Sequence, residues 1–220
     1  MKKIKLTASI ILFTCFISTI ISAQTFKVGV GGGLTQILGP DSYTNETSKL
    51  GSGYSTEFNF GLTGKLDLPL IPLTPRVIIL YHSLNGSGSY PLVAKKSLSS
   101  NPSVEYSQSI LSFGVGAQFG ILPIPLGIDP YLSLDLFLNK YGDSKRTFSD
   151  ELFVPISSNQ ISGGSRFGLQ VGVGAEITII PTVNLDVSAG YNLFNIIGKK
   201  DAEETLSAAT LDLFFIFNLN

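Results

Sequence analysis

Charged residues are scarce in this sequence of 220 residues: they make up 14% of the chain, whereas an average globular protein has about 25%. The formal net charge is −1 at pH 7, and 44% of the residues are hydrophobic. The charge balance excludes a basic nucleic-acid-binding domain. The high hydrophobic content excludes an intrinsically disordered chain, and the length corresponds to about one domain.

Cysteine, histidine and tryptophan are also scarce. The only cysteine is Cys15, the only histidine is His82, and tryptophan is absent. Because structural zinc sites need several cysteine and histidine ligands, no such site can form. The glycine run at 29–33 does not match the dinucleotide-binding pattern G-x-G-x-x-G, since position 34 is leucine. We therefore predict no metal site, no cofactor and no catalytic residue.

Residues 1–23 have the layout of a secretory signal peptide. The segment begins with three lysines, Lys2, Lys3 and Lys5, and continues with an apolar stretch over residues 6–21. The small residues Ser22 and Ala23 follow. The apolar stretch is shorter than the about 20 residues that a spanning helix needs, which favours a cleaved signal over a membrane anchor. We expect an exported protein with one domain, residues 24–220, that has no cysteine and hence no disulfide.

After residue 23, no run of 18 apolar residues is present, so no membrane-spanning helix is predicted. Instead, apolar and polar residues alternate with a period of two, which is typical of β-strands. In one segment, for example, Phe167 and Leu169 face one way, and Arg166 and Gly168 face the other. Eight such segments are found, at residues 26–31, 55–68, 76–83, 111–119, 131–139, 165–179, 183–193 and 210–219.

The composition of the two strand faces predicts which one lies inside. The polar face is rich in glycine, serine, asparagine and glutamine, with scattered charges of both signs. Glycine on a solvent-exposed face weakens a strand and packs nothing, but inside a narrow eight-stranded barrel it leaves room for other side chains. The large apolar face then contacts lipid. The fold class is therefore predicted as all-β, an eight-stranded antiparallel up-and-down transmembrane β-barrel preceded by a signal peptide.

The connections between the segments alternate in length, as they do in transmembrane barrels. Those at 69–75, 122–127 and 180–182 are short and contain proline, and we expect them to face the periplasm together with both chain ends. Longer polar loops are predicted on the other side, at residues 35–53, 84–103, 140–163 and 197–206.

Two segments carry a resemblance to a known family. Residues 189–193 read Ala-Gly-Tyr-Asn-Leu, and residues 211–217 read Leu-Asp-Leu-Phe-Phe-Ile-Phe. With the signal peptide, they are similar to the small outer-membrane β-barrel proteins of Gram-negative bacteria, the OmpA/OmpX-type and porin-like barrels. The resemblance implies a cell outer-membrane location, contact with outer-membrane lipid and insertion by the barrel-assembly machinery. It implies a structural or adhesive role, with an extracellular ligand bound through the long loops and at most a small pore.

Charged residues on the polar face are predicted to line the lumen. They are Lys27, Glu57, Lys65, Asp67, Arg76, Asp135, Arg166, Glu176, Asp186 and Asp212. Six of them, Lys27, Lys65, Asp67, Arg76, Glu176 and Asp186, fall in the periplasmic half if strand direction follows the turns. Because unpaired buried charge is costly, we expect these six to form a network that plugs the barrel.

Two other functions are open on the sequence alone. A lipid-modifying outer-membrane enzyme would need a nucleophile and a base, and His82 and Ser83 are near the expected outer rim. Because adjacent residues of a strand point to opposite faces, these two are not expected to reach each other, and we interpret His82 as a polar rim residue. The second alternative is a soluble periplasmic barrel that binds a small ligand, with its apolar face inside.

Overall fold

The computed structural model describes residues 25–45, 52–68, 71–89, 103–121, 127–148, 163–200 and 203–219. The predicted signal peptide, residues 1–23, lies outside the described residues. The described chain forms nine strands and one short helix. They are β1 (Thr25–Gly39), α2 (Asp41–Thr44), β2 (Thr56–Asp67), β3 (Leu73–Ser89), β4 (Ser103–Gly120), β5 (Ile128–Tyr141), β6 (Lys145–Phe148), β7 (Gly164–Ile180), β8 (Val183–Ile197) and β9 (Ser207–Leu219).

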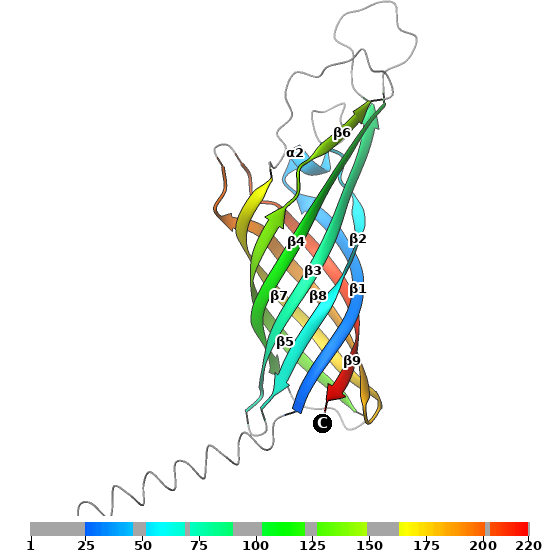
Figure 1. The fold of residues 1–220 in the computed structure, drawn as a ribbon, viewed down its shortest axis with the longest axis vertical. Helices are drawn as coiled ribbons and strands as arrows, with labels where there is room; N and C mark the ends of the chain where they lie inside the picture. The colour runs from blue at the N-terminus through cyan, green and yellow to red at the C-terminus, as the bar shows by residue number, and fades with distance from the viewer. Residues whose placement is uncertain are drawn as a thin grey trace, which may run out of the picture.

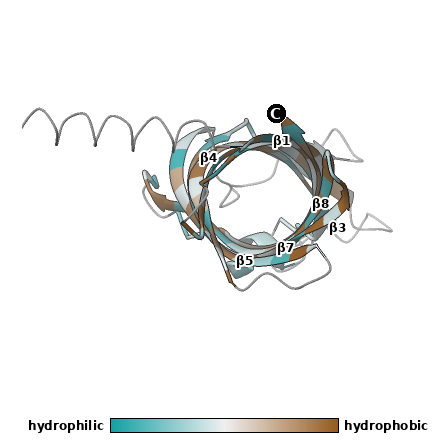
Figure 2. Ribbon diagram, turned by 90° about the horizontal axis from the view of Figure 1, so that it is seen from below, coloured by the Kyte–Doolittle hydropathy of each residue, from teal (hydrophilic) through white to brown (hydrophobic). Residues whose placement is uncertain are grey.

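Eight of the strands close into a ring, which Figure 2 shows along the barrel axis. Each of β1–β5 and β7–β9 pairs antiparallel with its neighbours along the chain, and β9 pairs with β1. The start of β1 and the end of β9 lie at the same, lower end (Figure 1). The prediction of an eight-stranded antiparallel up-and-down barrel is confirmed.

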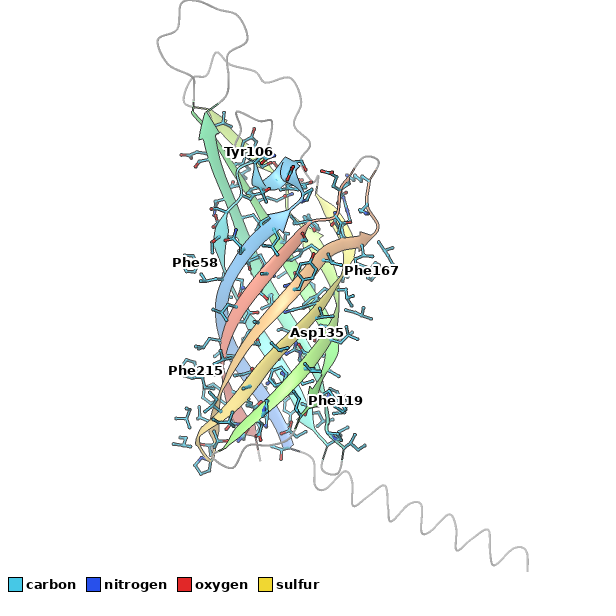
Figure 3. The ribbon with its side chains drawn as sticks, turned by 180° about the vertical axis from the view of Figure 1, so that it is seen from behind. Phe58, Tyr106, Phe119, Asp135, Phe167 and Phe215 are labelled. Atoms are coloured by element: carbon cyan, nitrogen blue, oxygen red, sulfur yellow. The ribbon has the colours of Figure 1, made fainter. Side chains whose placement is uncertain are left out.

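The alternation seen in the sequence places large apolar side chains on the outside. Phe58 is 74% exposed, Phe167 is 56% exposed and Phe215 is 50% exposed, and all three point away from the barrel in Figure 3. Leucine, isoleucine and valine side chains occupy the same face along every strand of the ring. Such an exterior is stable in lipid and not in water, which excludes the alternative of a soluble barrel with an apolar interior.

Inward-facing glycines make room for larger side chains in the narrow lumen. A Cβ atom at Gly31 would lie 2.8 Å from Cγ of Phe214, and one at Gly116 would lie 2.3 Å from Oδ1 of Asp135. Both are closer than van der Waals contact allows. The glycines on β1 and β4 are therefore the complement of the bulky residues on the neighbouring strands β9 and β5.

The sheet extends furthest beyond the upper rim along β3 and β4 (Figure 1). These strands pair up to Ser89 and Ser103, whereas the β2–β3 pairing ends at Asn59 and His82. The short strand β6 adds to the upper part of β4. We refer to residues 83–89 and 103–109 together with β6 as the outer ribbon.

The outer ribbon corrects the predicted loop boundaries. Residues 84–89 and 145–148 were expected in loops at 84–103 and 140–163, but they form strands. The segment 84–89 consists mainly of serine, glycine and asparagine, so it has no apolar face that alternation could detect. Its strand conformation depends on pairing with β4, which contributes Val104 and Tyr106. Within the described residues, no helix is long and apolar enough to cross a membrane.

Candidate functional site

A cluster of ion pairs lies in the lower part of the lumen, beside a pocket of about 290 Å³ whose lining includes Lys27, Asp67 and Glu176. The Lys27 ammonium lies 2.6 Å from a carboxylate oxygen of Asp67 and 2.5 Å from one of Glu176. The Lys65 ammonium lies 2.9 Å from the other oxygen of Glu176 and pairs with Asp186. The side chain of Lys65 is 1% exposed. Five of the six residues singled out in the sequence thus make one continuous set of ion pairs.

The strand register explains why these pairs form across the lumen. Lys27 is directly opposite Lys65 on β1 and β2, and Glu176 is directly opposite Asp186 on β7 and β8. Like charges that face each other on neighbouring strands repel. The two lysines therefore reach across the barrel to the two carboxylates. These ion pairs connect the β1–β2 wall to the β7–β8 wall.

The sixth residue, Arg76, pairs with a residue outside the predicted group. Its Nε and Nη2 atoms donate to the two oxygens of Asp135 at 2.7 and 2.5 Å. Asp135 on β5 lies inside the barrel (Figure 3), and its side chain has no exposed surface. Its place in the lumen followed from the alternation, but its pairing with Arg76 did not. Gly116 on β4 lies between the two residues, paired with Arg76 on β3 and with Asp135 on β5.

A second polar layer, which contains the carboxylate of Asp212, lies above the ion pairs. Asn59 donates to Asp212 at 2.8 Å and to the Thr35 hydroxyl at 3.0 Å, and that hydroxyl is 3.0 Å from Nδ1 of His82. Apolar side chains also occupy the lumen, which the polar-face pattern did not single out. They are Ile78, Leu80, Phe137, Phe214 and Ile216.

His82 lies inside the barrel and not at its rim. The residue is 1% exposed and packs edge-on against the Phe194 ring, with 5.1 Å between the ring centroids. The expectation of a polar rim histidine is therefore wrong, because β3 continues above it. Ser83, the next residue, points to the opposite face of β3, where its hydroxyl lies 3.3 Å from Asn85. The structure does not bring His82 and Ser83 together as a nucleophile and its base.

The upper end of the barrel is covered by a cap of apolar and tyrosine side chains. Tyr43 from α2 stacks on Tyr54 with 6.2 Å between the ring centroids. Leu84, Val104 and other inward residues of the upper strands pack into the same buried cluster. These buried side chains cover the upper lumen. The sequence pattern does not predict the cap, because it places residues 35–53 in a loop.

A charged clasp joins β7 to the β8–β9 connection beside the cap. Arg166 donates through Nε and Nη2 to Glu203 at 3.1 and 2.9 Å. Asn195 and the backbone N–H of Lys200 also donate to this carboxylate. Burial opposes ionisation of Glu203, but these hydrogen bonds outweigh it, and the pKa of the Glu203 carboxyl is lowered from its usual value. Across the described residues, no group of three histidine, cysteine, aspartate or glutamate side chains could hold a metal ion.

The sequence matches no family model and no curated protein. Solved structures do match its fold. Neisserial surface protein A superimposes with a TM-score of 0.54 at 17% identity, over 88% of this chain and 97% of that one. A major outer membrane protein of Thermus thermophilus has a TM-score of 0.53 at 11% identity, over 88% of this chain and 99% of that one. The chain therefore has the fold of outer-membrane barrels, as predicted.

We expect the Arg76–Asp135 pair to contribute strongly to stability. Arg76→Ala leaves the Asp135 carboxylate buried without a partner, which costs about 3–5 kcal/mol. Lys145→Ala, at an exposed position on β6, should change stability by less than about 0.5 kcal/mol. Urea unfolding in detergent micelles measures both. The double variant Arg76→Ala/Asp135→Ala should cost less than the sum of the two single variants, and equal midpoints for Arg76→Ala and Lys145→Ala would contradict a buried pair.

The Glu203 clasp should make stability depend on pH. Because its pKa is lower in the folded protein, its contribution is present above the usual value of 4.5 and is lost as the pH falls through the folded value. Glu203→Gln should therefore destabilise the barrel at pH 7 by about 1–3 kcal/mol, and the difference from the parent should shrink below pH 4.5. Unfolding midpoints at pH 7 and pH 3 test this, with Glu204→Gln, an exposed neighbour, as the control. A difference that does not change with pH would rule out the ionised clasp.

Proposed function

We propose that this protein is an outer-membrane barrel that carries no solute and that binds an extracellular ligand through its outer ribbon. The observation that carries the proposal is the contrast between the two parts of the fold. In this proposal side chains block the lumen at both levels, whereas the sheet continues past the upper rim on one side only. A blocked lumen is expected of a barrel that transports no solute. A sheet that projects beyond the rim offers a surface on which an extracellular ligand can bind.

Ion pairs and the tyrosine cap support a closed lumen. Lys65, Arg76 and Asp135 are all buried in the lower half, and the cap residues around Tyr54 are buried in the upper half. A solute would have to break several buried ion pairs, each costly to leave uncompensated. The six residues predicted from the sequence therefore act, in this proposal, together with Asp135 as the lower plug.

The outer ribbon supplies a surface on which a ligand can bind. A groove of about 350 Å³ lies between the start of β2, the upper parts of β3 and β4, and β6. Its lining is polar and includes Glu57, Asn85, Glu105 and Thr147. A cavity of this size is within the range of ligand sites in proteins.

The connections support an orientation of the barrel in the membrane. The turn at Pro181–Thr182 links β7 and β8 by two residues at the lower end, whereas the ribbon and the cap are built at the upper end. In barrels of this type the short turns face the periplasm and the longer connections face outward. The barrel-assembly machinery would insert the chain with the ribbon outside. No catalytic step is assigned to His82 or Ser83 in this proposal.

Conductance tests the closed lumen directly. Single purified barrels in a planar lipid bilayer should show no steady ion current in 1 M KCl, because charged and apolar layers fill the interior. As a comparison, Lys65→Ala/Arg76→Ala removes two of the three basic side chains of the lower plug and should raise the frequency of transient openings. A steady, voltage-independent current through the parent protein would overturn the proposal of a closed barrel.

Labelling in intact cells tests the orientation. Because the only cysteine lies in the predicted signal peptide, a single introduced thiol can be labelled selectively in the processed chain. Ser87→Cys on the ribbon should react with a membrane-impermeant maleimide in intact cells, since Ser87 is exposed. Asp129→Cys, exposed at the lower end, should react only after lysis. The reverse pattern would place the ribbon in the periplasm.

A further inference from the structure

In the part of the chain that the structure describes, the basic residues outside the lumen lie in one sector of the barrel. Among the described residues, every lysine and arginine that is neither in the lumen nor in the Arg166 clasp belongs to β5, β6 or the segment after β8. They are Lys140, Lys145, Arg146, Lys199 and Lys200. The outward-facing upper positions of β1, β2, β3 and β9 hold no basic residue. This asymmetry is not required by the barrel fold.

Three of these lysines lie at or just after the upper ends of β5 and β8, on either side of β7, and we name Lys140, Lys199 and Lys200 the lysine arc. The Lys199 ammonium donates to the Thr205 hydroxyl at 2.9 Å. Lys140 is directly opposite Ser165 in the strand register. Gly198, at a φ of +84°, turns the chain after β8 so that its Cα region packs against the Ser165 backbone. The Lys200 ammonium lies 3.5 Å from the carbonyl oxygen of Gly163. The arc thus spans the ends of three neighbouring strands.

The lysine arc is continuous with the lipid-facing surface. Directly below it, Leu138, Phe167 and Ile197 are paired neighbours on β5, β7 and β8. They are 39%, 56% and 65% exposed, respectively, and Phe167 points outward from the upper barrel in Figure 3. Lys140 follows Leu138 on the same face of β5. A lipid whose acyl chains contact these apolar residues would have its headgroup at the level of the lysines.

The charges near the arc favour an anionic headgroup. All three lysines are exposed, and none of them forms an ion pair with a described residue. Glu203 is close to Lys200, but its carboxylate is neutralised by Arg166. Asp143 and Glu204 are exposed carboxylates in the same upper region, but the three lysines outnumber them, so the net charge of these described residues is positive. Clusters of lysine at a membrane surface attract anionic lipids, and phosphate groups in particular.

We propose that the lysine arc binds the phosphorylated headgroup of a membrane lipid whose acyl chains lie on Leu138, Phe167 and Ile197. The site holds one lipid against the β5–β7–β8 sector and leaves the rest of the barrel circumference without such a contact. In the orientation proposed above, this lipid belongs to the outer leaflet. The lipid site itself does not depend on that orientation, because it is defined by the barrel surface.

The experiment is a titration of the full chain in phosphatidylcholine nanodiscs with a fluorescent lipid A that carries two phosphates. Each lysine near a membrane surface contributes roughly a fivefold change in affinity for anionic lipid. The triple variant Lys140→Gln/Lys199→Gln/Lys200→Gln should therefore bind the probe at least tenfold more weakly than the parent. Binding to the parent should also weaken as the NaCl concentration rises.

Matched controls distinguish binding at the lysine arc from a general effect of the protein's positive charge. Lys145→Gln removes an exposed lysine from β6, above the apolar surface, and should change the affinity less than twofold, whereas Lys140→Gln alone should lower it about fivefold. A lipid A without phosphates should bind weakly to the parent. Millimolar inorganic phosphate should not displace the lipid, because the acyl contacts contribute to its affinity.

Three results would overturn the lipid site. They are equal affinities of the parent and the triple variant, equal binding of the phosphorylated and phosphate-free lipids, and full displacement by inorganic phosphate. None of these results bears on the maleimide labelling of Ser87→Cys, so the lipid site and the proposed function fail separately. The triple variant replaces exposed residues only, and its urea midpoint, compared with that of the parent, verifies that it is folded.

Discussion

Hydrocarbon offers no partner to a backbone N–H or C=O group, and the structure of this protein depends on that constraint. A sheet in lipid must have no free edge within the membrane, so β9 pairs with β1 along almost its whole length, from Phe26 opposite Leu219 to Gly39 opposite Ser207. Once the ring is closed with eight strands, its interior is narrow. The apolar side chains of each alternating strand then face outward to the lipid, and the polar side chains face the narrow interior.

The narrow interior determines which residues can share a level. Large side chains occur where a neighbouring strand carries glycine, as with Phe214 beside Gly31 and Asp135 beside Gly116. Charges in this space are largely withdrawn from water, so each needs an opposite charge or a hydrogen-bond donor within reach. Asp212 meets this requirement with the amide of Asn59. Lys65 meets this requirement with Glu176 and Asp186, and Arg76 meets it with Asp135. The lumen is therefore a packed polar core held between lipid-facing walls.

The two ends of the barrel are built by different means. Below, ion pairs join facing walls of the lumen near the short turns. Above, α2 and the inward residues of the longer strands form a cap of tyrosine and aliphatic side chains. The Arg166–Glu203 ion pair lies beside this cap, and the outer ribbon rises from the packed upper end of the barrel.

The period-two pattern alone determined the eight lipid-crossing strands, the outward face of Phe58, Phe167 and Phe215, and the inward face of Lys27, Lys65 and Arg76. Side-chain direction in a strand is a local property of the backbone, so the sequence is sufficient to predict it. Only the tertiary structure decided that Arg76 pairs with Asp135, that His82 is buried beside Phe194, and that β3, β4 and β6 continue above the rim. Partners across a barrel depend on the register of strands far apart in sequence, and no local pattern encodes that register. The ribbon strand 84–89 has small polar residues on both faces, so its conformation depends on the neighbouring strand with which it forms hydrogen bonds.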